Sequence, residues 1–147
     1  MGEIRAKLRL ENLGDRIQFK AGNKAEKDIR FVEIEGVADT GAVVTLLPQE
    51  VVEALGLERI GRIIVSLADE RKIELDRVGP LSLTVAGRNM LMSCLMGPPG
   101  CEPLIGQTVM EELDLIPDPV RRTLTVRPES PLVPTLKLKG LAVEALA

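Results

Sequence analysis

The sequence predicts a single mainly-β domain, a barrel or sandwich built from about eight short strands and two short helices. Three observations support this class. Apolar and polar residues alternate in several short stretches, which is typical of half-buried strands. Turn-forming residues recur at intervals of roughly 8–12 residues. The chain has 147 residues, of which 45% are apolar, and this size and composition suit one domain with a substantial core.

The first third of the chain is expected to form three strands. Residues 4–10 alternate between apolar and charged side chains, and a turn at 11–15 separates them from a short second strand over 17–19. A third strand is expected over 29–34, with Phe31 as its core anchor.

A helix and a hairpin are expected next. Pro48 suits the start of a helix because its φ is fixed and it has no N–H to leave unpaired. Gly56 is expected to end that helix. The hairpin then consists of a strand over 60–67, a charged turn at 68–71 and a returning strand over 72–75.

The remaining elements follow the same reasoning. Residues 80–85 alternate and are expected to pair with residues 90–96 across a turn. A short apolar strand at 104–106 precedes a helix over 107–115, which two prolines terminate, and a last strand covers 122–127.

The chain is divided into a domain at residues 1–128 and a C-terminal tail at 129–147. The tail contains two prolines and a mixed apolar sequence. It is interpreted as a linker remnant, an added strand, a docking segment, a self-cleaved segment or a partner of strands that form a dimer, and the sequence does not choose between them.

Composition excludes several classes of function. The absence of His removes Ser-His and Cys-His catalysis and every His-based metal site. Cys94 and Cys101 match neither a zinc pattern nor a redox pair, so free thiols in a reducing compartment are expected. A net charge of −3 and the lack of Trp and Tyr argue against nucleic-acid binding. With no signal peptide and no membrane span in the sequence, we expect a cytoplasmic protein without metal or cofactor.

The most informative stretch is Val37-Ala38-Asp39-Thr40-Gly41-Ala42-Val43-Val44-Thr45-Leu46-Leu47. It places one acid in an apolar run, which is costly unless the acid is exposed or has a partner. Three interpretations compete. An Asp-Thr-Gly triplet can be an ordinary turn. The spacing Asp39-x-Gly41-x-x-Thr45 also resembles the phosphate loop of actin-like ATPases, although this chain shows no second phosphate loop. The third interpretation is an aspartic peptidase.

The sequence resembles the retropepsin family, the single-domain relatives of retroviral proteases, in three segments. These are the stretch at 37–47 followed by the helix from Pro48, the hairpin at 63–75 in the position of the flap, and Pro103-Leu104-Ile105-Gly106 before a helix and a final strand. The resemblance implies half of a closed β-barrel that is active as a symmetric homodimer.

The resemblance also implies roles for individual residues. Asp39 of each protomer would meet at the two-fold axis, where two carboxylates share one proton and activate a water. Thr40 and Gly41 would support the active-site loop. Thr45 would be buried and would tie the loop to the helix after Gly106. Substrate-binding positions would be Gly41, Ala42, Val43, Val44, Ala68, Asp69 and Ile105.

Two departures from the viral relatives are visible. Val43 and Gln107 stand where those proteins often have an Asp and an Arg that form an ion pair near the dimer contact. The hairpin turn at 68–71 lacks the glycines of viral flaps, and a plain solvated turn is the alternative for it. The expected function is an aspartic endopeptidase acting on peptide or protein substrates. The alternative is a dimeric retropepsin-like module that binds peptide without cutting it.

Overall fold

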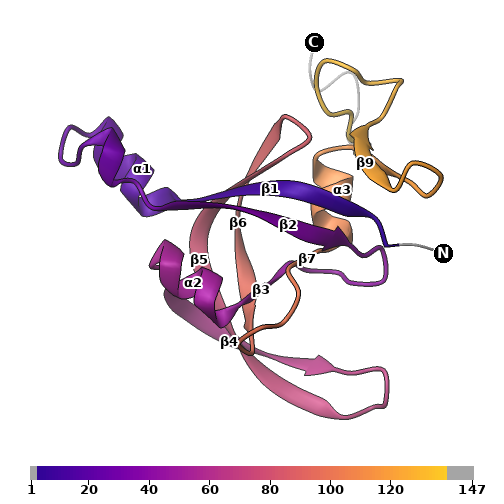
Figure 1. Ribbon diagram of the computed structural model, residues 1–147, viewed down its shortest axis with the longest axis horizontal. Helices are drawn as coiled ribbons and strands as arrows, with labels where there is room; N and C mark the ends of the chain where they lie inside the picture. Colours follow the sequence, from indigo (N-terminus) through magenta and orange to yellow (C-terminus); the bar gives the residue numbers. More distant parts are fainter. Residues whose placement is uncertain (1–2, 139–147) are drawn as a thin grey trace.

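The computed structural model describes residues 3–138, and it shows a mainly-β protein with a mixed seven-stranded sheet and three short α-helices (Figure 1). The strands of this sheet lie in the order β1-β2-β7-β3-β6-β5-β4, and β1 also pairs with β5. A separate two-stranded sheet contains β8 and β9. The strands are β1 (Arg5–Asn12), β2 (Phe31–Ala38), β3 (Leu46–Pro48), β4 (Glu58–Ser66), β5 (Lys72–Val85), β6 (Arg88–Gly97), β7 (Leu104–Ile105), β8 (Leu115–Asp118) and β9 (Thr123–Val126). The helices are α1 (Leu13–Lys20), α2 (Gln49–Leu55) and α3 (Gln107–Glu112), with a 3-10 turn at Glu26–Asp28.

The strand pairings place three short segments at the centre of the sheet. β7 runs parallel to β2, with Ala38 opposite Ile105, and antiparallel to β3, with Leu46 opposite Leu104. β3 in turn runs parallel to β6. The connection from β2 to β3 therefore starts on one side of β7 and returns on the other.

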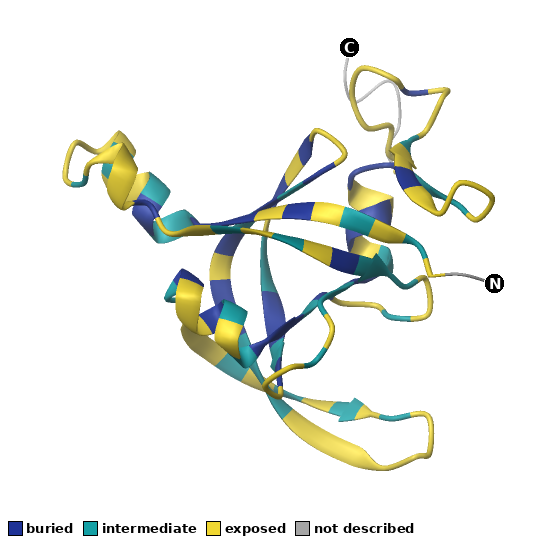
Figure 2. Ribbon diagram, viewed as in Figure 1, coloured by how far each residue is buried: buried dark blue, intermediate teal, exposed yellow. Residues whose placement is uncertain are grey.

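The core is aliphatic, as the near absence of aromatic residues requires. Alternation along β5 buries Leu81, Leu83 and Val85 on one face, and Leu8 and Leu10 of β1 pack into the same cluster. Figure 2 shows buried and exposed residues as alternating bands along the strands of the sheet. The mainly-β class predicted from the sequence is confirmed.

The helix α2 also confirms its prediction. Pro48 is the residue before its first turn and lies in an extended conformation, with φ −68° and ψ 154°. Gly56 ends the helix in the left-handed region at φ 63°, which a residue without Cβ adopts readily. Val52 and Leu55 provide its buried face.

The predicted turn at 11–15 and the predicted strand at 17–19 are both wrong. β1 continues through Asn12, and α1 occupies Leu13–Lys20. The Asn12 side chain accepts a hydrogen bond from the Asp15 amide at 2.9 Å, which is the usual way of starting a helix. Asp15 then lies in the first turn and Lys20 in the last, as the helix dipole favours. These capping residues outweighed the short Ile-x-Phe alternation.

Phe31 is not the core anchor that the pattern indicated. Its side chain is 51% exposed, and the Arg9 guanidinium lies over its ring at 4.2 Å. Ile29, just before β2, is buried instead.

Three further differences lie downstream. The strands expected at 72–75 and 80–85 form one strand, β5, whose register shifts between Val78 and Leu81. The third helix ends at Glu112, earlier than expected, and Pro117 lies within β8 and does not mark the end of the helix. Of the predicted tail, residues 139–147 lie outside the described part, and the domain boundary at 128 stays a prediction. Within residues 3–138, no helix is long and apolar enough to cross a membrane.

Candidate active site

Asp39 follows directly after β2, and its backbone is held by β7. The Val37 amide donates to the Pro103 carbonyl at 2.9 Å, and the Asp39 amide donates to the Ile105 carbonyl at 3.0 Å. These two bonds continue the parallel pairing of β2 with β7 up to the first residue of the loop. Asp39 therefore begins its loop from a fixed point of the sheet.

A tight turn aims the Asp39 carboxylate. Its Oδ1 accepts a hydrogen bond from the Gly41 amide at 2.8 Å, and its carbonyl accepts one from the Ala42 amide at 3.1 Å. A Cβ on residue 41 would lie 3.2 Å from Oδ1, which is closer than most real contacts. Asp39 is half-buried, and Thr40 and Gly41 are exposed. The triplet is thus a turn, as its simplest interpretation states, and one that presents a carboxylate at the surface.

The helix α3 holds the far side of the loop. The Gln107 amide donates to the Ala42 carbonyl at 2.7 Å, and the Thr108 amide donates to the Val43 carbonyl at 3.2 Å. The Thr108 hydroxyl also donates to the Val43 carbonyl, at 2.8 Å. The first amides of a helix have no partner within it, so the loop carbonyls satisfy two of them. Loop and helix therefore fix each other.

Gly106 is required by the crossing of the loop over β7. A Cβ at this position would lie 2.7 Å from the carbonyl carbon and oxygen of Val43 and from the oxygen of Val44. Real Cβ atoms essentially never approach other atoms so closely. The sequence resemblance drew attention to Gly106 without this reason, and it missed Thr108 altogether. A hydroxyl residue in the first turn after an apolar-apolar-Gly segment was the available signal.

Thr45 is buried as expected, with 1% of its surface exposed, but its hydroxyl does not tie the loop to α3. Its Oγ1 has no hydrogen-bond partner among the residues that the structure describes. Its carbonyl accepts a bond from the Leu95 amide at 3.0 Å, which joins the end of the loop to β6. Thr108 makes the contact that was predicted for Thr45.

The other predicted substrate-binding residues fall into two groups. Val43 and Val44 are exposed on the loop, at 70% and 36%, and Ala42 is half-buried beside them. The Ile105 side chain, in contrast, is fully buried in the core, and only its carbonyl reaches the loop. Its role in substrate binding stays a prediction.

Ala68 and Asp69 lie at the exposed tip of the hairpin formed by β4 and β5. The tip is closed by a bond from the Leu67 amide to the Arg71 carbonyl at 2.7 Å and by an Asp69–Arg71 ion pair at 2.6 Å. Glu70 adopts a positive φ of 68° there, in place of a glycine. Figure 1 shows the hairpin projecting from the sheet, with β4 as an outer strand.

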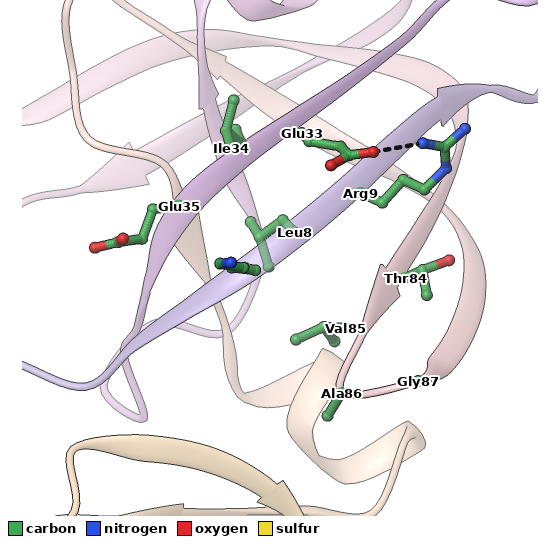
Figure 3. Close-up of a pocket in the computed structure, with 10 residues that line it drawn as sticks. Leu8, Arg9, Glu33, Ile34, Glu35, Thr84, Val85, Ala86 and Gly87 are labelled. Atoms are coloured by element: carbon green, nitrogen blue, oxygen red, sulfur yellow. Dashed lines mark hydrogen bonds and ion pairs between the residues drawn. The ribbon is translucent and has the colours of Figure 1, made fainter.

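Two cavities stand out in the described part of the chain, and neither has Asp39 in its wall. A cavity of about 1030 Å³ lies between α3, β8 and the segment after β9, and Thr40 lines one part of it. A smaller one of about 550 Å³ lies where β1 separates from the end of β5 (Figure 3). Its wall includes the Arg9–Glu33 pair, joined at 2.8 Å, and Val85.

The two thiols are separate and differ in exposure. Cys94 is buried in the core, and burial raises the pKa of its thiol to about 12. Cys101 is half-buried in the loop before β7, and burial raises its pKa as well. Neither thiol is poised as a nucleophile, because a nucleophilic cysteine needs a lowered pKa.

No protein-family model matches the chain, and no curated protein matches it.

Proposed function

We propose that this protein is an aspartic endopeptidase of retropepsin type, in which Asp39 of two copies forms the catalytic pair. The observation that carries the proposal is the position of Asp39. Its carboxylate lies half-buried at the surface, on a loop whose backbone is held on one side by β7 and on the other by α3. A catalytic group needs such positioning, because small displacements of a reacting group cost large factors in rate.

The chemistry follows from bringing two such loops together. Two carboxylates about 3 Å apart cannot both ionise, so they share one proton. The ionised member takes a proton from a water held between them, and that water attacks the peptide carbonyl. The protonated member donates a hydrogen bond to the carbonyl oxygen as negative charge develops on it. No metal or cofactor is needed, because the water is activated by the carboxylates.

The surroundings of the loop suit an extended, apolar peptide. Val43 and Val44 are exposed next to Asp39. The hairpin carries apolar side chains on both faces, with Ile64 exposed at 68% and its neighbours Ile63 and Val65 half-buried. An extended peptide lying between loop and hairpin would add as a strand and place alternate side chains in apolar contacts.

The sheet topology supports the finer fold assignment, half of a closed retropepsin-like barrel. β1 pairs with β2 along its length and with β5 over Arg9–Asn12, so the strand pairings run from β1 through β2, β7, β3, β6 and β5 back to β1 and leave β4 outside as an edge strand. A symmetric dimer of two such halves would complete the site.

The test compares the wild type with Asp39→Asn on a mixed peptide library, read by mass spectrometry. Asn keeps the shape of the side chain but cannot act as a base, so cleavage should fall to background. Asp28→Asn is the matched control, since Asp28 is an exposed acid in the 3-10 turn and should retain full activity. Equal cleavage by wild type and Asp39→Asn would refute the proposal.

A dimeric module that binds peptide without cutting it is the second candidate. The hairpin tip favours it, because the Asp69–Arg71 pair and the turn bonds fix a tip that has no glycine. This candidate expects the wild type and Asp39→Asn to be equally inert in the library assay and to retain the same peptides on a column.

A further inference from the structure

The segment that follows β9 is anchored to the body of the protein by a buried polar cluster. Asp114 lies at its centre and is only 6% exposed. Its carboxylate accepts hydrogen bonds from the Ser130 hydroxyl, from Arg127 at 2.7 Å and from the Thr135 amide at 3.1 Å. Hydrogen bonds from Ser130 and Arg127 lower the pKa of Asp114 to about 2, so the anchor is charged at ordinary pH.

Arg88 strengthens the same anchor from the sheet. It is buried at the start of β6, and its guanidinium donates to the Leu113 carbonyl at 2.7 Å and to the Ser130 carbonyl. Buried charged groups that are fully hydrogen-bonded give a fixed geometry. The segment 130–138, here called the arm, is thus held at Ser130 and again at Thr135.

The arm nevertheless exposes most of its apolar side chains. Leu132 and Leu138 are 90% and 73% exposed, and Val133 and Leu136 are 68% and 56% exposed. Figure 2 shows the segment beyond β9 as exposed except for one buried band, and every residue from 131 to 138 is exposed. Isolated exposed apolar residues are normal, but a group of four on one anchored segment marks an interaction surface.

Beside the arm lies the cavity of about 1030 Å³, which the arm itself helps to line. Leu136 and Leu138 line it from the arm, Glu112 lines it from the end of α3, and Thr40 lines it from the active-site loop. The arm surface is therefore continuous with the loop that the proposed function places at the two-fold axis. A two-fold contact needs a surface that is complementary to itself, and an apolar ridge next to an open cavity has this property.

The charged residues of this cavity also suit a contact with a second copy of the chain. Lys137 and Glu112 line the same cavity, Lys137 from the arm and Glu112 from the end of α3. Both side chains are exposed, and among residues 3–138 neither takes part in an ion pair. In a two-fold dimer, Lys137 of one copy and Glu112 of the other would pair twice.

We propose that the arm, residues 130–138, is a homodimer contact that packs into the α3 cavity of a second copy, with Lys137 of one protomer facing Glu112 of the other. This inference rests on the proposed function for the position of the axis, and it adds a contact separate from Asp39.

A charge exchange between subunits tests it. Lys137→Glu alone and Glu112→Lys alone each bring like charges together at both pairs of a homodimer. A mixture of the two variants restores opposite charges at both pairs of the mixed dimer, one pair native and the other reversed. The double variant Lys137→Glu with Glu112→Lys restores opposite charges at both pairs of its own homodimer and is measured beside it. Each single variant should dissociate about tenfold more readily at low salt, and the double variant should recover wild-type affinity. Sedimentation measures the affinities, and native mass spectrometry identifies the dimers. A double variant as weak as the single ones would overturn the proposal.

The apolar part has its own matched comparison. Leu136→Ser with Leu138→Ser should weaken the dimer by at least tenfold, while Leu91→Ser, at a leucine of β6 that is 58% exposed, should leave it unchanged. Wild-type affinity in the double serine variant, or a wild type that is monomeric, overturns the arm contact. If the arm variants weaken the dimer but no peptide is cut by the wild type, the peptidase proposal fails and the arm contact stands. If the wild type cuts peptides and the arm variants dimerise with wild-type affinity, the arm contact fails and the peptidase proposal stands.

Discussion

Replacing Gly106 with alanine tests the idea that the loop carrying Asp39 is held by its close crossing over β7. The added Cβ would lie 2.7 Å from three backbone atoms of Val43 and Val44, whereas ordinary contact begins at 3.4 Å. The loop must therefore withdraw by roughly 0.7 Å, and backbone atoms cannot turn aside as a flexible side chain can. Overpacking of this kind costs about 1–3 kcal/mol.

Two effects set the net magnitude. Alanine restricts the unfolded chain and so returns about 0.4–1 kcal/mol of stability where the folded backbone accepts it. Gly106 has φ −91°, which alanine adopts without strain, so this gain applies in full. The free energy of unfolding should fall by about 1–2 kcal/mol, equivalent to roughly 2–8 °C in melting temperature. The proposed peptidase activity should fall further, because displacing the loop moves Asp39.

Urea unfolding followed by circular dichroism measures the change, with the slope of the transition expected to stay constant. Gly61→Ala is the matched control, because no atom lies within 4 Å of the position that its Cβ would take and its φ is not positive. It should be neutral or slightly stabilising. If Gly106→Ala and Gly61→Ala gave the same stability and activity, the close crossing would not be what holds the loop.

Three further predictions concern buried groups. Thr45→Val should leave the free energy of unfolding unchanged or raise it by up to about 2 kcal/mol, because the buried Thr45 hydroxyl has no hydrogen-bond partner among the described residues. A loss above about 1 kcal/mol in urea unfolding would show that the hydroxyl does make a hydrogen bond. Hydrogen bonds from Arg30 hold the pKa of Asp15 well below its usual range, so its stabilisation is present above about pH 4 and is lost as the pH falls. Asp15→Asn should flatten that acid limb of the stability curve, and an unchanged limb would contradict the assignment. Brief alkylation with iodoacetamide should modify Cys101, which is half-buried, and leave Cys94 unmodified, because Cys94 is buried in the core. Mass spectrometry of tryptic peptides measures the labelling. Equal labelling of the two thiols would mean that the core opens readily.

The sequence was sufficient for the parts of the fold in which local chemistry and tertiary packing agree. Pro48 and Gly56 delimit α2 in the manner that their backbone preferences dictate. The alternation at 80–85 belongs to a strand whose alternate side chains are buried. The end of β2 was predicted less well: a strand was expected over 29–34, but β2 covers Phe31–Ala38 and ends directly before Asp39.

The fold prediction failed where two apolar residues happened to be spaced as in a strand, and where a residue contacts a side chain from a distant part of the sequence. Ile17 and Phe19 alternate like a strand, but the Asn12 cap started a helix. Phe31 is apolar enough for the core, yet it lies under Arg9 at the surface. The role of Thr108 depends on the loop arriving from Val43, 65 positions away in the chain, which no local pattern contains.

The outer strand β4 carries a further consequence. A free sheet edge with apolar side chains is a template for self-association into β-aggregates. Here Arg62 pairs with Glu74 across the hairpin at 3.1 Å, Arg59 reaches Asp76 at 3.4 Å, and the register is irregular between Arg59 and Gly61. Charged side chains and such irregularities interrupt a regular edge and discourage uncontrolled pairing. The exposed apolar side chains of the hairpin thus lie beside an edge whose charges and irregular register discourage uncontrolled strand pairing.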